Sequence, residues 1–220
     1  MTKRMDFVPA AGWDVLTPLY DAGIRLLTNE RRWRAALLEQ VAPKPGETIL
    51  DVGCGTGSFA ILLKKAAPHS RVIGLDPDPR ILERAAAKAT AAGVDIEWWQ
   101  GFSRDAADLG IAVDKAVSSL VFHQVPMAEK RAGIAAMVAA TVPGGEVHIA
   151  DFARQRRPAM RMAFAAIGWL DGRANTVPNA HGALEDILSA IDPAAGEPSR
   201  DFLSACGQIS LFRLRRASQA

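Results

Sequence analysis

The residues with the clearest chemical potential are three glycines that follow an acidic side chain. They lie in Asp51-Val-Gly53-Cys-Gly55-Thr-Gly57, between an apolar run suited to a buried strand and a segment suited to a helix. Glycine permits positive φ angles and lets a ligand lie directly on the backbone, and the helix that follows offers free N–H groups. The pattern therefore predicts a loop that binds a ligand with anionic or polar atoms.

The spacing of this loop separates it from two other nucleotide-binding motifs. A dinucleotide fingerprint, G-x-G-x-x-G, requires glycine where Ser58 stands, and the phosphate loop of nucleotide triphosphatases requires a G-K-[ST] ending that is absent. A second apolar run ends in Asp76, 19 residues after Gly57. A carboxylate at that distance can accept both hydroxyls of a ribose. The alternative is a turn or helix-cap role, because prolines follow at positions 77 and 79.

Alternating strand and helix signals must position these residues. After helices within Trp13–Val41, broken near Gly23 and Thr28, the chain repeats short apolar runs and helical patterns. The expected strands are Thr48–Val52, Arg71–Leu75, Val94–Trp99, Val113–Leu120 and Glu146–Ala150, with one or two more in Phe202–Leu214. The expected helices between and after them are Ser58–Ala67, Pro79–Ala92, Met127–Thr141 and Leu184–Ile191. This order predicts an α/β fold with a parallel sheet covered by helices on both faces.

Composition and charge exclude several classes of protein. The chain has 220 residues, 49% hydrophobic and 23% charged, which excludes a disordered or fibrous protein. No apolar run is long enough to span a membrane, and Met1–Pro9 is not followed by the apolar stretch of a secretory signal. The two cysteines cannot form a disulfide framework or a four-ligand zinc site by themselves, so no metal and a cytoplasmic location are expected. The net charge of +2 favours no nucleic-acid partner.

At these motifs the sequence resembles the class I S-adenosylmethionine-dependent methyltransferases. Ile49–Gly57 is similar to their first motif, and Gly74-Leu75-Asp76 is similar to the motif that ends their second strand. Val113–Leu120 resembles their fourth strand, and Thr141–Gly145 resembles the proline-glycine turn before the fifth. The resemblance covers residues 15–151 and is nearest to the branch with ubiquinone/menaquinone biosynthesis C-methyltransferases and phospholipid N-methyltransferases.

The resemblance implies a doubly wound, seven-stranded, mostly parallel sheet of the Rossmann-like methyltransferase type, with N-terminal helices and a helical insertion after the fifth strand. One domain is expected over residues 1–220. Its parts are a helical cap (1–42), a cofactor-binding core (46–151), an acceptor-site insertion (152–182), and a closing helix and strands (183–220). The implied activity is methyl transfer from S-adenosylmethionine to a small hydrophobic or amphiphilic acceptor, with S-adenosylhomocysteine as product. The alternative is a protein that binds S-adenosylmethionine without transferring its methyl group.

The resemblance also implies which residues hold the cofactor. Asp51 is expected to steady the glycine loop or the methionine ammonium, while Gly53 and Gly55 let the methionine moiety approach the backbone. Asp76 is expected to hold the ribose hydroxyls, with Pro77 near the adenine. The set is completed by Cys54, a small residue without a nucleophilic role, by Leu120 after the fourth strand, and by Tyr20, which either folds over the cofactor or belongs to the core.

One position departs from the family pattern. Relatives often carry an acid after the third strand that binds the adenine amine, but here Phe102 occupies that place in Gln100-Gly-Phe-Ser103. A phenylalanine ring cannot accept the hydrogen bond, although it can stack on adenine or cover it. Adenine recognition is then expected to rely on Ser103 and its N–H. This departure motivates the non-catalytic alternative.

His123 is the candidate catalytic residue. It follows the fourth strand, where ligands of open α/β sheets bind, and its ordinary pKa near 6.5 suits a general base. It either takes a proton from the acceptor or closes the cofactor pocket by bonding a carbonyl. His148, inside the fifth strand, is expected to be structural. Ser118–Val121 does not match the Asn/Asp-Pro-Pro-Tyr motif of nucleic-acid methyltransferases.

The segment after the fifth strand mixes basic residues with an apolar stripe. In relatives this insertion forms part of the acceptor pocket, so its apolar side chains and the residue before His123 are candidates for the acceptor site. They are Phe122, Met160, Phe164 and Trp169. The arginines at 154, 156, 157 and 161 either meet an anionic headgroup or membrane surface, which makes any membrane contact peripheral, or form the solvated face of a packed helix.

Overall fold

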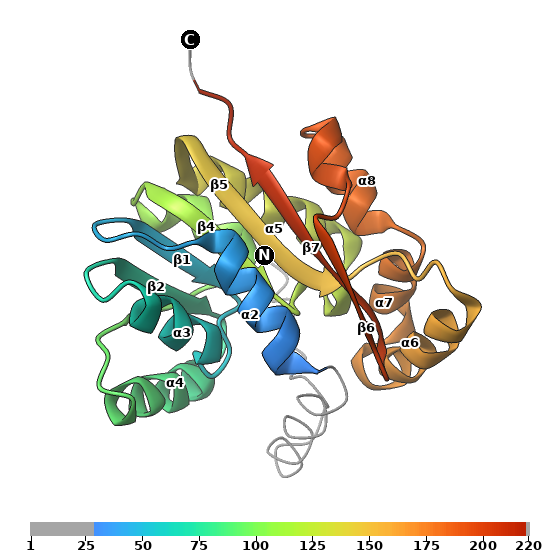
Figure 1. Ribbon diagram of the computed structural model, residues 1–220, viewed down its shortest axis with the longest axis horizontal. Coiled ribbons are helices and arrows are strands. Elements are labelled where there is room, and N and C mark those ends of the chain that lie inside the picture. Colours follow the sequence, from blue (N-terminus) through green and yellow to red (C-terminus); the bar gives the residue numbers. More distant parts are fainter. Residues whose placement is uncertain (1–28, 219–220) are drawn as a thin grey trace, which may run out of the picture.

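The computed structural model describes residues 29–218, which form one sheet of seven strands covered by helices (Figure 1). The strand order is β3-β2-β1-β4-β5-β7-β6, and within this part of the chain only β7 runs antiparallel to its neighbours. The strands are β1 (Thr48–Val52), β2 (Arg71–Asp76), β3 (Glu97–Gln100), β4 (Val113–Ser119), β5 (Thr141–Phe152), β6 (Arg200–Ser204) and β7 (Gly207–Arg215). This confirms the predicted α/β class and the mostly parallel sheet.

Helices cover both faces of the sheet (Figure 1). They are α2 (Glu30–Val41), α3 (Ser58–Ala66), α4 (Pro79–Ala91), α5 (Met127–Ala140), α6 (Pro158–Asp171), α7 (Arg173–Ala180) and α8 (Ala183–Ser189), with 3-10 helices η1 (Ser103–Leu109), η2 (Phe122–Gln124) and η3 (Pro193–Gly196). α4 starts as its sequence predicts, because the Asp78 carboxylate accepts the Arg80 N–H at 2.9 Å and Pro79 fills the first turn.

Two hydrophobic cores lie on opposite faces of the sheet. Side chains alternate along a strand, so in β1 Ile49 joins the core under α2, α3 and α4, while Leu50 joins the core under α5 and α8. Trp98 and Trp99 of β3 divide between the faces in the same way, as their adjacent positions predict. α2 supplies the fully buried Trp33 and anchors the N-terminal side of the fold. The other helix expected within Trp13–Val41 lies outside the described residues.

Two of the five predicted parallel strands begin at other residues than the sequence-based expectation. β5 begins at Thr141 rather than Glu146, so the prediction of a turn at Pro143-Gly144-Gly145 is wrong. Those residues form an irregularity inside the strand, where the pairing with β4 shifts between Val113 and Lys115. β7 continues the ladder there, because the Gly144 N–H donates to the carbonyl of Arg216. β3 begins at Glu97, three residues later than expected.

The segment after β5 is helical, as predicted for the insertion. α6 and α7 follow β5 and lie beside β7 and β6 (Figure 1). The closing segment contains α8, the short η3, and the strands β6 and β7. A tight turn that ends at the buried Cys206 joins these two strands. Among the helices that the structure describes, none is long and apolar enough to cross a bilayer. The sheet places the loops after β1, β2, β4 and β5 at one edge, and these loops form the candidate site.

Candidate functional site

The glycine loop bends from β1 into α3 and leaves one glycine facing open space. The N–H groups of Gly53 and Cys54 both donate to the Leu75 carbonyl, at 2.8 and 3.0 Å, which holds the loop against β2. Gly53 has φ +70°, and a methyl group there would overlap the Val121 side chain. Gly55 has φ +53°, but a methyl group there would meet no atom within 4 Å. The loop is therefore closely packed at Gly53 and open at Gly55.

Asp51 is a buried carboxylate without a hydrogen-bond partner. Its side chain is 0% exposed, and neither oxygen has a partner within the described residues. Burial raises the pKa of this carboxyl to about 7, and the positive charge of Arg34 on α2 partly offsets that effect. The Nη1 of Arg34 pairs with Glu30 at 2.7 Å. A bound cation would satisfy Asp51, since unpaired buried carboxylates are costly.

Asp76 joins the end of β2 to the glycine loop. Its Oδ2 accepts the Gly55 N–H at 3.0 Å, and its Oδ1 accepts the Asp78 N–H at 3.1 Å. Burial raises the pKa of this carboxyl above its ordinary value. The side chain remains half-buried, and each oxygen has a second lone pair for a ligand hydroxyl. The turn role and the ligand-binding role that the sequence left open are therefore compatible. Pro77, the next residue, is also half-buried.

Cys54 belongs to the loop but has no nucleophilic character. Its side chain is buried and lies against Gly74 of β2. Burial and the negative charges of Asp51 and Asp76 raise the pKa of its thiol far above the ordinary value. A thiol that stays protonated is a poor nucleophile, so Cys54 serves as a small packing residue.

The region after β3 contains an acid that the sequence reasoning missed. Asp105 of η1 accepts the N–H of Phe102 at 2.8 Å, so a carboxylate lies within three residues of the position where the family acid was expected. An acid three residues into a helix is a capping position, and this signal was present in the sequence. The Phe102 ring is covered by the Arg104 guanidinium at 4.4 Å. Ser103 turns its hydroxyl toward Gly133 of α5.

The loop after β4 starts with a strained residue. Leu120 has φ +56°, an uncommon conformation for a residue with a branched side chain, and its N–H donates to the Ala150 carbonyl of β5 at 2.9 Å. This conformation directs the chain from β4 into η2. Phe122, expected near the acceptor, is fully buried in the core under α5 instead.

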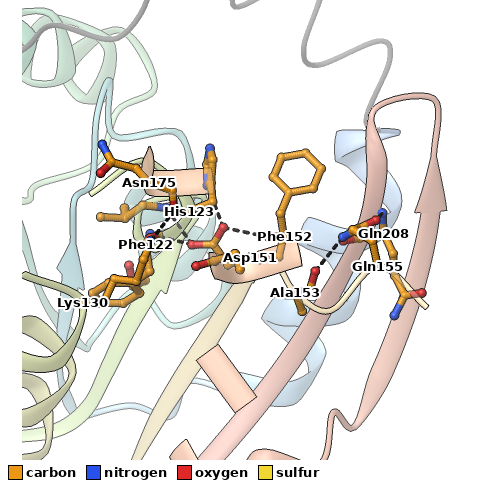
Figure 2. A network of polar contacts seen from close by, with 12 residues as sticks. Phe122, His123, Lys130, Asp151, Phe152, Ala153, Gln155, Asn175 and Gln208 are labelled. Carbon is orange, nitrogen blue, oxygen red and sulfur yellow. Dashed lines mark hydrogen bonds and ion pairs between the residues drawn. The ribbon is translucent and has the colours of Figure 1, made fainter. Parts of the chain in front are cut away.

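His123 is held by a buried carboxylate at the end of β5 (Figure 2). Its Nδ1 lies 2.7 Å from Asp151 Oδ1, and both side chains are almost entirely buried. Asp151 also accepts the N–H groups of Phe122 and Phe152, at 2.6 and 2.7 Å, and that of Val121 at 3.1 Å. The sequence analysis found His123 but missed Asp151, whose only signal was an acid directly after a strand. The carboxylate fixes the ring orientation and favours the tautomer with its proton on Nδ1.

The insertion places its apolar side chains unequally. Phe164 is 2% exposed and stacks on Phe152, with ring centroids 4.7 Å apart. Phe152 in turn meets the His123 ring edge to face at 5.1 Å. Met160 is half-buried near the start of α6. Trp169 belongs to α6, but its side chain lies outside the described part of the structure, as does Tyr20.

His148 has a structural environment, as predicted. His148 is fully buried in β5, where its Nδ1 faces Gln40 Nε2 at 3.2 Å and its Nε2 lies 3.2 Å from Glu146. Burial lowers the pKa of its imidazole. Between residues 29 and 218, no group of three or more His, Cys, Asp or Glu side chains is arranged to hold a metal ion.

The chemistry of the strand-end residues fits S-adenosylmethionine. The buried oxygens of Asp51 suit its ammonium group, and the open backbone at Gly55 leaves room for its methionine moiety. The half-buried Asp76 suits its ribose hydroxyls.

Comparisons with known proteins agree with this arrangement. Residues 49–145 match the sequence profile of a methyltransferase domain. A demethylmenaquinone methyltransferase from Deinococcus radiodurans is 33% identical over 140 residues, covering 62% of this chain and 57% of that protein. A ubiquinone/menaquinone biosynthesis C-methyltransferase from Roseobacter denitrificans is 28% identical, covering 70% of this chain and 60% of that protein. The chain therefore spans about three fifths of the length of these curated relatives.

A solved structure supports the fold independently. Magnesium protoporphyrin IX methyltransferase from Synechocystis, with bound S-adenosylhomocysteine, superimposes with a TM-score of 0.63 at 20% identity. The alignment covers 93% of this chain and 89% of that one, so the two share the fold over nearly their whole length. In its motifs, its strand order and these relatives, the chain is similar to the class I S-adenosylmethionine-dependent methyltransferases, and its residues 49–145 match a methyltransferase domain.

Proposed function

We propose that this protein transfers a methyl group from S-adenosylmethionine to a small hydrophobic or amphiphilic acceptor. The observation that carries the proposal is the carboxylate of Asp51, which has no hydrogen-bond partner among residues 29–218 and lies beside an open glycine loop, because it supplies a buried anion for the methionine ammonium. The open backbone at Gly55 then accepts the methionine moiety, and Asp76 accepts the ribose hydroxyls. Pro77 and the Phe102 ring border the proposed position of the adenine. The named relatives are methyltransferases, so the non-catalytic alternative is not favoured.

His123 is the proposed general base. S-adenosylmethionine, when bound, supplies a methyl group already activated on a sulfonium, so the chain must mainly orient the acceptor and remove its proton. Asp151 holds the proton on Nδ1, which makes Nε2 the basic nitrogen. Nε2 takes the proton that the acceptor loses, and the Asp151 carboxylate stabilises the imidazolium that forms. Phe152 packs against the ring, Phe164 packs against Phe152, and the two help to exclude water.

A quinol or phenol is the proposed acceptor class. Two named relatives are a demethylmenaquinone methyltransferase and a ubiquinone/menaquinone biosynthesis C-methyltransferase. The reduced form of a quinone is an aromatic ring with hydroxyl groups. Removal of the hydroxyl proton by His123 would raise the electron density of such a ring. Met160 of α6 belongs to the proposed apolar wall, and Trp169 of the same helix stays a candidate for the acceptor site. Both cysteines of the chain are free, in agreement with a proposed reducing, cytoplasmic location.

Calorimetric titration with S-adenosylhomocysteine tests the cofactor site first. The wild type should bind it, and Asp76→Ala should lose at least about tenfold in affinity, because a hydrogen bond to a charged group contributes roughly 1.5–3 kcal/mol. Asp95→Ala is the matched control, since this exposed carboxylate lies before β3, at the opposite edge of the sheet. Absence of binding to the wild type would contradict the proposal.

Methyl transfer is then measured with labelled S-adenosylmethionine and a panel of acceptors. Demethylmenaquinol is the first acceptor, followed by simple phenols and phosphatidylethanolamine. Transfer to the quinol or to phenols, lost in His123→Gln with retained S-adenosylhomocysteine binding, supports both the acceptor class and the base. Transfer to the phospholipid alone would contradict the acceptor class, and undiminished transfer in His123→Gln would exclude the base.

A further inference from the structure

The loop that carries His123 is tied down by side chains from three different elements (Figure 2). Asp151 of β5 accepts two of its N–H groups and holds the imidazole. Lys130 of α5 donates to the Phe122 carbonyl, and Asn175 of α7 donates from Nδ2 to the Gln124 carbonyl at 2.9 Å. The carbonyls on both sides of His123 are therefore held by side chains that lie outside the loop.

Lys130 and Asn175 are also hydrogen-bonded to each other. Lys130 Nζ also donates to the Asn175 carbonyl, at 3.0 Å. Asn175 thus receives a hydrogen bond from α5 through its main chain and gives one to the loop through its side chain. Because α7 belongs to the proposed acceptor-site insertion, these bonds join the insertion to the loop of the proposed base.

Lys130 is an expensive residue in this place. Its side chain is 0% exposed, and burying an ammonium is costly unless its hydrogen bonds are satisfied. Burial lowers the pKa of Lys130 to about 8, while the charge of Asp151 acts in the opposite direction. An apolar side chain of similar length would fill this space without that cost, but it would leave the carbonyls of Phe122 and Asn175 without the donor.

We propose that Lys130 and Asn175 are positioning residues that keep the acceptor-site insertion aligned with His123. The inference rests on the proposed function for the role of His123. Lys130 acts through the Phe122 carbonyl and fixes the loop from one side, while Asn175 acts through the Gln124 carbonyl and fixes it from the other. Neither touches the reacting atoms, so their loss should change catalysis and acceptor binding while cofactor affinity is retained.

The test compares Lys130→Met, Lys130→Arg and Asn175→Ala with a matched control, Asn179→Ala. Asn179 lies on the same helix, is fully buried and donates one hydrogen bond to a carbonyl, that of Phe152, at 2.8 Å. It has no bond to the loop of His123 among the described residues. Asn175→Ala and Asn179→Ala therefore each remove one hydrogen bond from α7 to a main-chain carbonyl, but only the first removes a tie to the loop.

The first readout is the Nδ1–H proton of His123, observed by NMR in protein labelled with 15N-histidine and assigned by its loss in His123→Gln. A ring held against Asp151 protects this proton from exchange with water. Lys130→Met should broaden or abolish the signal, Lys130→Arg should restore it at least in part, and Asn179→Ala should leave it unchanged. A signal that is unchanged in both Lys130→Met and Asn175→Ala would overturn the inference. This readout needs no acceptor, so it is independent of whether the proposed activity is found.

The second readout is kinetic and uses the acceptor found with the wild type. Lys130→Met should lower kcat by about tenfold to a hundredfold, because small misplacements of a catalytic group have effects of this size. Asn175→Ala should raise the KM for the acceptor more than tenfold, with the affinity for S-adenosylhomocysteine within twofold of the wild type. If Lys130→Met fails to fold, Lys130→Arg and Asn175→Ala carry the test. An equal kinetic loss in Asn179→Ala would show a merely structural role and would overturn the inference.

Discussion

Replacing Asp51 with asparagine should stabilise the protein at neutral pH and weaken its cofactor site. The carboxylate is 0% exposed and its two oxygens lack hydrogen-bond partners within residues 29–218. Asparagine has nearly the same size but no charge, so it removes the cost of burying an anion. In the proposed function that anion serves the cofactor ammonium, and the same substitution removes its partner.

The pKa of Asp51 sets both the size and the sign of the effect on stability. Burial raises this pKa from 3.8 to about 7, so the folded protein holds a proton on Asp51 that the unfolded chain has already released. The free energy of unfolding then decreases as the pH rises from about 4 to about 7. At roughly 1.4 kcal/mol for each pH unit, the whole decrease is about 4 kcal/mol. Asp51→Asn lacks this decrease.

Urea unfolding at several pH values between 4.5 and 8 measures this difference. Asp51→Asn and the wild type should have similar stability at the acidic end, and the variant should be more stable by about 2–4 kcal/mol at pH 8. Asp95→Asn, at an exposed carboxylate, is the control. Its stability should follow that of the wild type across this pH range. A stability difference between Asp51→Asn and the wild type that is the same at every pH would refute the reasoning.

Cofactor binding gives a second check on the same residue. An ammonium beside Asp51 favours the ionised carboxylate, so binding of S-adenosylhomocysteine near pH 6.5 should release a proton. The release appears as a dependence of the calorimetric enthalpy on the ionisation enthalpy of the buffer. Asp51→Asn should release no proton there and should bind about tenfold to a hundredfold more weakly. Equal affinity in the two proteins would show that Asp51 does not meet the ammonium.

Four further substitutions have outcomes that follow from local geometry. Gly55→Ala should lower the free energy of unfolding by about 1–2 kcal/mol, from its positive φ alone, and should abolish S-adenosylhomocysteine binding. Gly53→Ala should be less stable than Gly55→Ala, because its methyl group also overlaps a neighbouring side chain. Chemical denaturation and calorimetry separate the two effects. Asp151→Asn should lower the free energy of unfolding by about 3 kcal/mol, since its amide would face a donor. Phe164→Ala should lower it by about 3 kcal/mol through the cavity it leaves, and a loss under 1 kcal/mol would show that the site collapses around it.

The local elements and the cofactor loop could be predicted because their signals lie within a few residues of each other. The apolar runs of β1, β2 and β4, the glycine spacing from Gly53 to Gly57, and the cap at Asp78 each act through neighbours in the chain. Asp76 could be placed because parallel strands end at the same edge of the sheet. His123 could be placed for the same reason.

The boundary at Pro143-Gly144-Gly145 could not be predicted in this way. These residues favour a turn when read locally, but pairing with β4 on one side and β7 on the other keeps them in the strand as an irregularity. The tertiary hydrogen bonds outweigh the local preference. Phe122 precedes the proposed base in sequence, yet its side chain is buried in the core under α5, which depends on tertiary packing.

The sequence alone determined the resemblance to a family, the alternation of strands and helices, and the position of the glycine loop. Only the tertiary structure decided how the charged groups pair. Asp151 meets His123 across 28 residues, Lys130 reaches the Asn175 carbonyl across 45, and the oxygens of Asp51 have no hydrogen-bond partner in the described part of the chain. A charge pattern does not specify these outcomes, because each depends on which side chains the packed sheet and helices bring together away from water. The chemistry proposed here rests on that pairing.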